Sequence, residues 1–253
     1  MPMAEMKWDA KAYDGGFNFV TSYGDAVLEL LNPQPGERIL DIGCGTGKHV
    51  AKLSEFGCKV VGIDMDEAML TEARDHFPTG KFVFADAQTW HSDQPFDAAF
   101  SNAALHWIPD LAAVFTRTHE NLKPGGRLVF EMGGKGNVKT ASDSLAQAFT
   151  EITGKELENP KNYLSIGEVS ALLEPAGFRV ESAWHFDRPT PLSGDDGLRD
   201  WYRVFSVRSL SQCPAELHKE LLDRAVDLAR PHLMTETGWI ADYVRLRVKA
   251  TRS

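Results

Sequence analysis

The sequence of 253 residues is poor in cysteine, has no long apolar run and carries no excess of positive charge. Its three cysteines, Cys44, Cys58 and Cys213, are scattered and fit neither a disulfide framework nor a metal-binding spacing. No apolar run approaches the ~20 residues that span a bilayer, and the first residues lack the apolar core of a signal peptide. We therefore expect a cytoplasmic protein with reduced thiols, no metal and no membrane partner.

The net charge of the chain indicates which kinds of ligand it can bind. A formal net charge of −9 disfavours a polyanionic ligand, because phosphate binding is driven by clustered Lys and Arg. Basic residues do gather between Arg245 and Arg252, but they alternate with apolar residues as on the outer face of a half-buried strand. A hydrophobic content of 43% supports a full core. We expect a small-molecule substrate, no nucleic acid, and a monomer or homodimer.

The most informative segment is a glycine-rich turn, Asp41 to Gly47, which directly follows the apolar run Arg38 to Leu40. A dinucleotide-binding turn needs a third glycine at the start of the next helix, and this chain has Lys48 there. Asp41 would also repel a pyrophosphate. An acid beside a tight glycine turn instead suits a cationic ligand without phosphate, such as S-adenosylmethionine (SAM). Taken alone, the turn is equally well a plain connection between strand and helix.

Further predicted strands repeat this arrangement of an apolar run that ends in a polar residue. Lys59 to Asp64 and Phe82 to Ala87 each place an acid at or just after the strand end, and Phe96 to Asn102 ends in an amide. The segment Leu122 to Glu131 is a helix end and turn that leads into another strand. Alone, Asp64 or Asp86 would be a helix cap. Their common position at strand ends indicates a shared ligand-binding edge.

Together these motifs resemble class I SAM-dependent methyltransferases, closely over residues 36–135 and in outline elsewhere. The resemblance implies an α/β fold, with a doubly wound, seven-stranded, mostly parallel sheet of order 3-2-1-4-5-7-6, an antiparallel strand 7 and a helical cap. It implies one domain over 1–253, with a helical lid at 7–31, a SAM-binding core at 36–135 and a cap insertion at 190–235. We expect helices at 195–207 and 214–230 in that insertion, after a break at Pro189 to Pro191.

The resemblance also implies the cofactor contacts. The SAM-binding set would be Asp41, Gly43, Cys44, Gly45, Gly47, Asp64, Met65, Met69, Asp86, Ala87, Ser101, Asn102 and Leu105, with Tyr13 and Phe19 from the lid. Asp64 would hold the ribose hydroxyls and Asp86 the adenine amino group. Other interpretations stay open: Cys44 as a small turn residue, Met69 as core, and the two lid aromatics as anchors of a helix.

The loop Ser101 to Asp110 resembles the branch that contains trans-aconitate and malonyl-carrier-protein methyltransferases, which methylate free carboxylates. It lacks the Asn/Asp-Pro-Pro-aromatic tetrad of methyltransferases that act on nucleobase amines. His106 is the candidate catalytic residue, as base or as orienter; it is equally well a loop histidine bonded to backbone. The candidate substrate-binding residues are His106, Trp107, Arg199, Trp201, Tyr202 and Arg203. Methylation of another small metabolite and a non-catalytic SAM-binding scaffold are the alternative functions.

Overall fold

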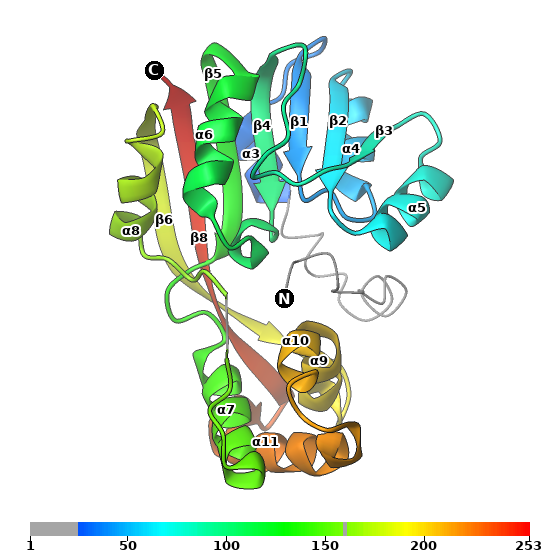
Figure 1. Cartoon of the computed structure of the whole chain (residues 1–253), viewed down its shortest axis with the longest axis vertical. Coiled ribbons are helices and arrows are strands. Elements are labelled where there is room, and N and C mark those ends of the chain that lie inside the picture. Colours follow the sequence, from blue (N-terminus) through cyan, green and yellow to red (C-terminus); the bar gives the residue numbers. More distant parts are fainter. Residues whose placement is uncertain (1–24, 159–160) are drawn as a thin grey trace. The chain divides into compact units, whose positions relative to one another are not determined.

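The computed structural model describes residues 25–158 and 161–253 (Figure 1). The strands are β1 (Arg38–Ile42), β2 (Lys59–Asp64), β3 (Lys81–Phe84), β4 (Phe96–Asn102), β5 (Leu122–Gly133), β6 (Phe178–Pro191), β7 (Met234–Thr235) and β8 (Gly238–Arg252). The α-helices are α3 (Asp25–Leu31), α4 (Lys48–Glu55), α5 (Glu67–His76), α6 (Leu111–Asn121), α7 (Lys139–Thr153), α8 (Ile166–Leu173), α9 (Gly197–Phe205), α10 (Val207–Leu210) and α11 (His218–Leu233). Two 3-10 turns are η2 (Leu105–Trp107) and η3 (Ala215–Leu217). None of the described helices combines the length and the apolar character needed to cross a bilayer.

The chain divides into two compact units. The described part of the first unit comprises residues 25–134, 161–185 and 246–253, and that of the second comprises residues 135–158 and 186–245. The chain therefore leaves the first unit twice, after Gly134 and after His185, and returns to it both times.

The strand order is β3-β2-β1-β4-β5-β8-β6, and the two-residue β7 pairs with β8 off this path. This confirms the predicted order, because β8 is the seventh strand of the expected fold once the short β7 is set aside. The strands β1 to β5 pair in parallel wherever they are neighbours. Their carboxyl ends therefore share one edge, which carries Asp64 of β2 and Asn102 of β4.

The parallel strands are apolar on both faces because helices cover both. Successive residues of a strand point to opposite faces: Ile39 packs in a cluster with α3 and α4, and Leu40 packs in another with α6 and α8. On β5, Val129 packs in the same cluster as Ile39, and Phe130 packs in the same cluster as Leu40. A sheet buried on both faces holds its strand ends rigidly, and these ends carry the polar residues of interest.

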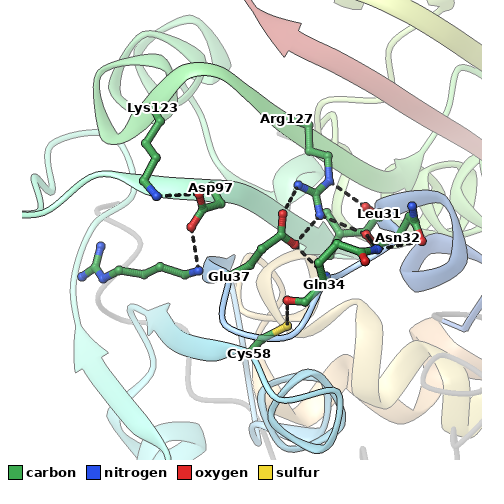
Figure 2. A network of polar contacts seen from close by, with 9 residues as sticks. Leu31, Asn32, Gln34, Glu37, Cys58, Asp97, Lys123 and Arg127 are labelled. Atoms are coloured by element: carbon green, nitrogen blue, oxygen red, sulfur yellow. Dashed lines mark hydrogen bonds and ion pairs between the residues drawn. The ribbon is translucent and has the colours of Figure 1, made fainter.

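A polar network ties the opposite, amino-terminal edge of the sheet together (Figure 2). Arg127 of β5 donates two hydrogen bonds to the Glu37 carboxylate (2.8 and 2.7 Å). Its Nε donates a third to the Leu31 carbonyl at the end of α3 (2.7 Å). Asp97 of β4 accepts from the Arg38 amide (2.9 Å) and from Lys123 (2.5 Å). These contacts join the starts of β1, β4 and β5 and anchor α3 to them.

The second unit corrects one prediction. Pro189 and Pro191 were expected to interrupt the strand, but β6 continues through both of them and ends at Pro191. The Leu192 amide, just past the strand, donates to the Trp239 carbonyl of β8 (2.9 Å). Residues at odd positions, including both prolines, therefore turn their backbone nitrogen away from β8, and an edge strand tolerates proline there. The predicted helices of this region are present as α9 and α11, with the short α10 between them.

Candidate active site

The glycine turn between β1 and α4 has left-handed backbone at Gly43, Gly45 and Gly47, with φ of 72°, 52° and 79°. The three glycines differ in what surrounds them. A Cβ on Gly43 would lie 2.2 Å from the Ala104 Cβ, and one on Gly47 would lie 2.7 Å from the Phe82 ring. A Cβ on Gly45 would meet no atom of residues 25–158 or 161–253 within 4 Å. Packing therefore explains two of the glycines, whereas Gly45 faces space that the described residues leave open to a ligand.

Two acids lie against this turn. The Asp64 carboxylate accepts from the Gly45 amide (2.8 Å) and from the Asp66 amide (2.9 Å), one bond to each oxygen. Each oxygen keeps a further lone pair for a ligand. Burial raises the pKa of Asp64 above its ordinary range, against the effect of these backbone bonds. The next residue along the chain, Met65, is partly exposed, and Met69 is buried in the first turns of α5.

Asp41 is the most buried of these acids, with 1% of its surface exposed. Its Oδ2 has no hydrogen-bond partner among the described residues. Burial, and then the neighbouring charge of Asp64, raises the pKa of Asp41 to about 8. A buried carboxylate oxygen without a partner is costly, so its presence at the start of the glycine turn fits a ligand that brings a positive charge or a donor.

Asp86 lies just past the end of β3 and is held by Gln88. The Gln88 side-chain amide donates to both Asp86 oxygens (3.0 and 2.9 Å), and the Gln88 backbone amide donates to one of them (2.9 Å). The Ala85 amide bonds the Asp64 carbonyl (2.9 Å), so this turn and the Asp64 turn adjoin. Ala87, between Asp86 and Gln88, is partly exposed.

The loop after β4 packs on the glycine turn. Ala103 has a φ of 59°, a strained backbone for a residue with a side chain, and its amide donates to the Glu131 carbonyl (2.8 Å). Ala104 follows and fills the space next to Gly43. Ser101 is fully buried and donates its hydroxyl to the Ile42 carbonyl (2.8 Å), which locks β4 to β1. Leu105 is likewise fully buried in the core.

His106 is buried and fixed from several sides. Its Nδ1 accepts from the Gly133 amide (3.3 Å), and its carbonyl accepts from the Asn162 amide (3.0 Å). Its ring packs against Trp107 and Tyr163, with centroids 5.2 and 5.6 Å away. The predicted alternative, a loop histidine bonded to backbone, is therefore what the structure shows at Nδ1.

The segment Lys161 to Leu164, which we call the strap, holds the His106 loop. Asn162 donates its side-chain amide to the Ile108 carbonyl (2.6 Å), and Leu164 bridges Gly134 at the end of β5. Lys161 places its Nζ 4.6 Å from the centre of the Trp107 ring, and burial lowers the pKa of this lysine to about 8. The strap was not predicted from the sequence, because its contacts join residues far apart in the chain.

The four remaining substrate candidates lie on α9, in the second unit. Trp201 and Tyr202 are buried, and their polar atoms bond within that unit: the indole to the Tyr243 hydroxyl (2.6 Å) and the phenol to the Ala141 carbonyl (2.7 Å). Arg199 pairs with Asp223 (2.5 Å). Arg203 is exposed and pairs with Asp200 (2.8 Å). A substrate acid at either arginine would have to compete with an acid already there.

The other predicted contacts vary in position. Tyr13 and Phe19, and the lid as far as residue 24, lie outside the described residues. Cys44 turns its side chain into the protein, and a Cβ on Gly62 would lie 2.7 Å from its Sγ. Burial raises the pKa of the Cys44 thiol well above its ordinary value, as befits a small packing residue. Within the described ranges, no group of three or more His, Cys, Asp or Glu could hold a metal ion.

Three features near this edge were not predicted from the sequence. Gln88 and the strap are two of them, and the third is the ion pair between Glu131 of β5 and Arg247 of β8. Glu131 is fully buried, and its Oε2 accepts from both Nε and Nη2 of Arg247 (2.9 and 2.7 Å). The alternation of basic residues on β8 indicated only an outer strand face, and gave no signal for a buried partner.

The chain is similar to known proteins in sequence and in fold. A model of the methyltransferase domain family matches residues 16–183. A trans-aconitate 2-methyltransferase of Variovorax paradoxus is 32% identical over 80% of this chain and 83% of its own. An uncharacterised methyltransferase of Schizosaccharomyces pombe is 30% identical over 98% of this chain and 99% of its own. The solved SAM-dependent methyltransferase of Mesorhizobium loti, 23% identical, has a TM-score of 0.55 over 94% of this chain and 99% of its own.

The sheet order, the glycine turn and these similarities define the class, a class I SAM-dependent methyltransferase. The chain belongs to the methyltransferase domain family that matches two thirds of its length. It is an enzyme, and its cofactor is SAM, in agreement with the prediction from the sequence.

Proposed function

We propose that this chain transfers the methyl group of SAM to a carboxylate oxygen of a small organic acid. The observation that carries the proposal is the similarity to a trans-aconitate 2-methyltransferase over four fifths of both chains. That similarity extends well beyond the glycine turn, which methyltransferases of many substrates share.

The residues that would hold SAM follow from the site. Gly45 offers the open approach, and the unpartnered oxygen of Asp41 suits the ammonium group of the amino-acid end. The free lone pairs of Asp64 suit the ribose hydroxyls, and Asp86 with Gln88 suits the adenine amino group. SAM supplies, when bound, a methyl group that its sulfonium has already activated.

The chain then has to place the acceptor and exclude water, because proximity and orientation supply most of the rate in such a transfer. A carboxylate is already ionised near neutral pH and needs no general base. It does need donors to replace its hydration. His106 and Trp107, in the loop whose Ala104 packs on Gly43, are the proposed acceptor residues of the first unit. Arg199, Trp201, Tyr202 and Arg203 remain proposed acceptor residues of the second unit.

A screen with SAM labelled in its methyl group tests the proposal. Trans-aconitate and other small di- and tricarboxylic acids form one panel, and phenols and amines form two others. We expect labelled product in the acid panel, and mild alkali should release the label as methanol, as it does from esters only. The Gly45→Val protein, checked for native circular dichroism, is the control for non-enzymatic methylation. Product from phenols or amines alone, or a label stable to alkali, would overturn the carboxylate proposal and leave the family assignment intact.

A further inference from the structure

We infer that Gln88 is a positioning residue for the cofactor: it holds the Asp86 carboxylate as an acceptor for the adenine amino group, and so makes the chain select a 6-amino purine over a 6-oxo purine. This rests on the proposed function for the assignment of Asp86 to adenine, and it is independent of the identity of the methyl acceptor. The basis is the set of hydrogen bonds around Gln88, a residue that no motif of the sequence singles out.

The two ends of the Gln88 side-chain amide have different partners. Its Nε2 donates to both oxygens of Asp86 (3.0 and 2.9 Å), and its Oε1 accepts from the Asp110 backbone amide (3.2 Å). A carboxylate can only accept and a backbone N–H can only donate, so both contacts require the same orientation of the amide group. A glutamate here would place a second carboxylate against Asp86, and a lysine would place a donor against the Asp110 N–H. Glutamine supplies the donor and the acceptor at once.

Gln88 leaves Asp86 one oxygen that can accept from a ligand. Among the residues that the structure describes, Asp86 Oδ1 accepts from the backbone and side-chain amides of Gln88, and Oδ2 accepts from the side chain alone. A carboxylate oxygen has two lone pairs, so one at Oδ2 is left for a further donor. The adenine amino group is such a donor. The carbonyl of a 6-oxo purine is an acceptor, and it would meet an acid that has no hydrogen to give it.

The turn that carries Asp86 and Gln88 is attached to both ends of α6. The Asp86 carbonyl accepts from the Trp90 amide (2.8 Å), and the Trp90 carbonyl accepts from the side chain of Asn121 at the end of α6 (3.2 Å). Gln88 is bonded to Asp110, which caps the start of that helix. The Asp86 carboxylate is therefore ordered before a cofactor arrives, and this lowers the entropy that binding must lose.

The Asp86 turn adjoins the residues proposed to hold the rest of the cofactor. The Ala85 amide donates to the Asp64 carbonyl (2.9 Å), and the Asp64 carboxylate accepts from the Gly45 amide (2.8 Å). Asp64 and Asp86 follow neighbouring parallel strands, β2 and β3, and such strands lie about 4.8 Å apart. A base joined to a ribose at Asp64 is thus within reach of Asp86.

Calorimetric titration of the full chain with two ligands tests the selectivity. One is S-adenosylhomocysteine, the demethylated product of SAM, and the other is S-inosylhomocysteine, in which an oxygen replaces the 6-amino group. We expect the wild type to bind the adenosyl compound at least about 10-fold more tightly. Gln88→Met keeps the length of the side chain without its polar atoms, and should weaken that compound by roughly 5- to 50-fold and the inosyl compound by less than about 3-fold. Thr89→Val, an exposed change in the same turn, is the matched control and should alter neither affinity.

Gln88→Glu tests the orientation of the amide through its pH dependence. The protonated form of the new carboxyl group can donate to Asp86 and accept from Asp110, whereas its ionised form repels Asp86. We expect this variant to bind S-adenosylhomocysteine roughly 10-fold more weakly than the wild type at about pH 8, and to return toward the wild type at about pH 5. The affinity is taken relative to the wild type at the same pH, which removes the effect of Asp41, whose own pKa is raised to about 8. A deficit that does not change with pH would overturn the inferred contacts.

A double-mutant cycle shows whether Gln88 acts through Asp86. Asp86→Ala alone should abolish the preference for the adenosyl compound, and Gln88→Met should then have no further effect on the ratio of the two affinities. A ratio that falls by the same factor with and without the Asp86 carboxylate would overturn the positioning role.

Other results are also decisive. If Gln88→Met weakens both compounds equally, Gln88 only supports the turn. If it weakens neither, Gln88 has no part in binding, and if the wild type does not prefer the adenosyl compound, Asp86 does not read the base. Each of these results overturns the inference. The measurements need no methyl acceptor, so a failed screen of acids would defeat the proposed carboxylate substrate and leave the role of Gln88 to be decided separately.

Discussion

At the scale of single residues, Asp41 shows how a binding site opposes stability. Its carboxyl group is buried beside Asp64, and its pKa is raised to about 8. A raised pKa means that the folded protein holds this proton more tightly than the unfolded chain does. The Asp41 contribution to folding therefore weakens as the pH rises from about 4 toward about 8. A bound cation would reverse this effect by favouring the carboxylate form.

We predict that Asp41→Asn separates stability from binding. The amide has the same shape and cannot ionise, so the mutant should lose less free energy of unfolding than the wild type between pH 6 and pH 8.5. Its SAM affinity should fall by about 10- to 100-fold, because a charge-assisted bond becomes a neutral one. Urea unfolding at both pH values and calorimetric titration with SAM measure these effects. A stability difference independent of pH would show that Asp41 is not the group that titrates.

At the scale of elements, the glycines in the turn between β1 and α4 differ in their surroundings: Gly43 is tightly packed and Gly45 is not. We predict that Gly43→Ala is strongly destabilising, because the new Cβ would collide with Ala104 at 2.2 Å. Gly45→Ala should cost only about 1 kcal/mol, the strain of a side chain at positive φ, because its surroundings are open. The Gly45 variant should nevertheless lose most of its SAM affinity.

Thermal unfolding with and without SAM distinguishes the two variants. SAM should raise the melting temperature of the wild type by mass action and should leave that of Gly45→Ala nearly unchanged. A Gly45→Ala protein with normal SAM affinity would mean that this glycine serves the backbone conformation alone.

Elements also show how far the sequence predicts the structure. The parallel strands were predictable because each is an apolar run that ends in a polar residue, and this pattern also placed Asp41 and Asp64 at one edge. The continuation of β6 through Pro191 was not, because proline is tolerated only on an edge and the sequence alone does not say which strand is one. The strap was not predictable either, because Asn162 and His106 meet only through folding.

The same limit applies to side chains whose role depends on a distant partner. Trp201 and Tyr202 carry polar atoms that suit a substrate, but Tyr243 and Ala141 bind those atoms within the second unit. Arg247 reads as a solvent-facing residue of a strand, and its buried partner Glu131 is more than a hundred positions away. The pattern of a strand or helix shows which face a residue occupies. It does not show which side chains or carbonyls that residue will contact after folding.

At the scale of the whole molecule, the first unit has to be stable although its binding edge contains a strained backbone at Ala103 and a buried acid, Asp41. In the first unit the amino-terminal edge of the sheet supplies this stability through the network around Arg127 (Figure 2). The Arg127 hydrogen bond is the main reason that the pKa of Glu37 lies below its ordinary range. A lowered pKa means that the pair stabilises the fold above the ordinary range of a glutamate, and that this contribution is lost as the pH falls through the lowered value.

We predict that Arg127→Met lowers the free energy of unfolding by about 2–4 kcal/mol at pH 7, because it leaves Glu37 and the Leu31 carbonyl without their donor. Arg74→Met is the matched control in the same unit: its pair with Glu67 is exposed, and its loss should cost less than about 1 kcal/mol. Urea unfolding of both variants and the wild type at pH 7 and at pH 3 measures the effect. The Arg127 deficit should shrink toward acid pH as Glu37 takes up a proton, while the Arg74 deficit stays small at both pH values. An Arg127 deficit as small as that of Arg74, or one that grows in acid, would show that packing of the arginine stem holds this edge together rather than its charge.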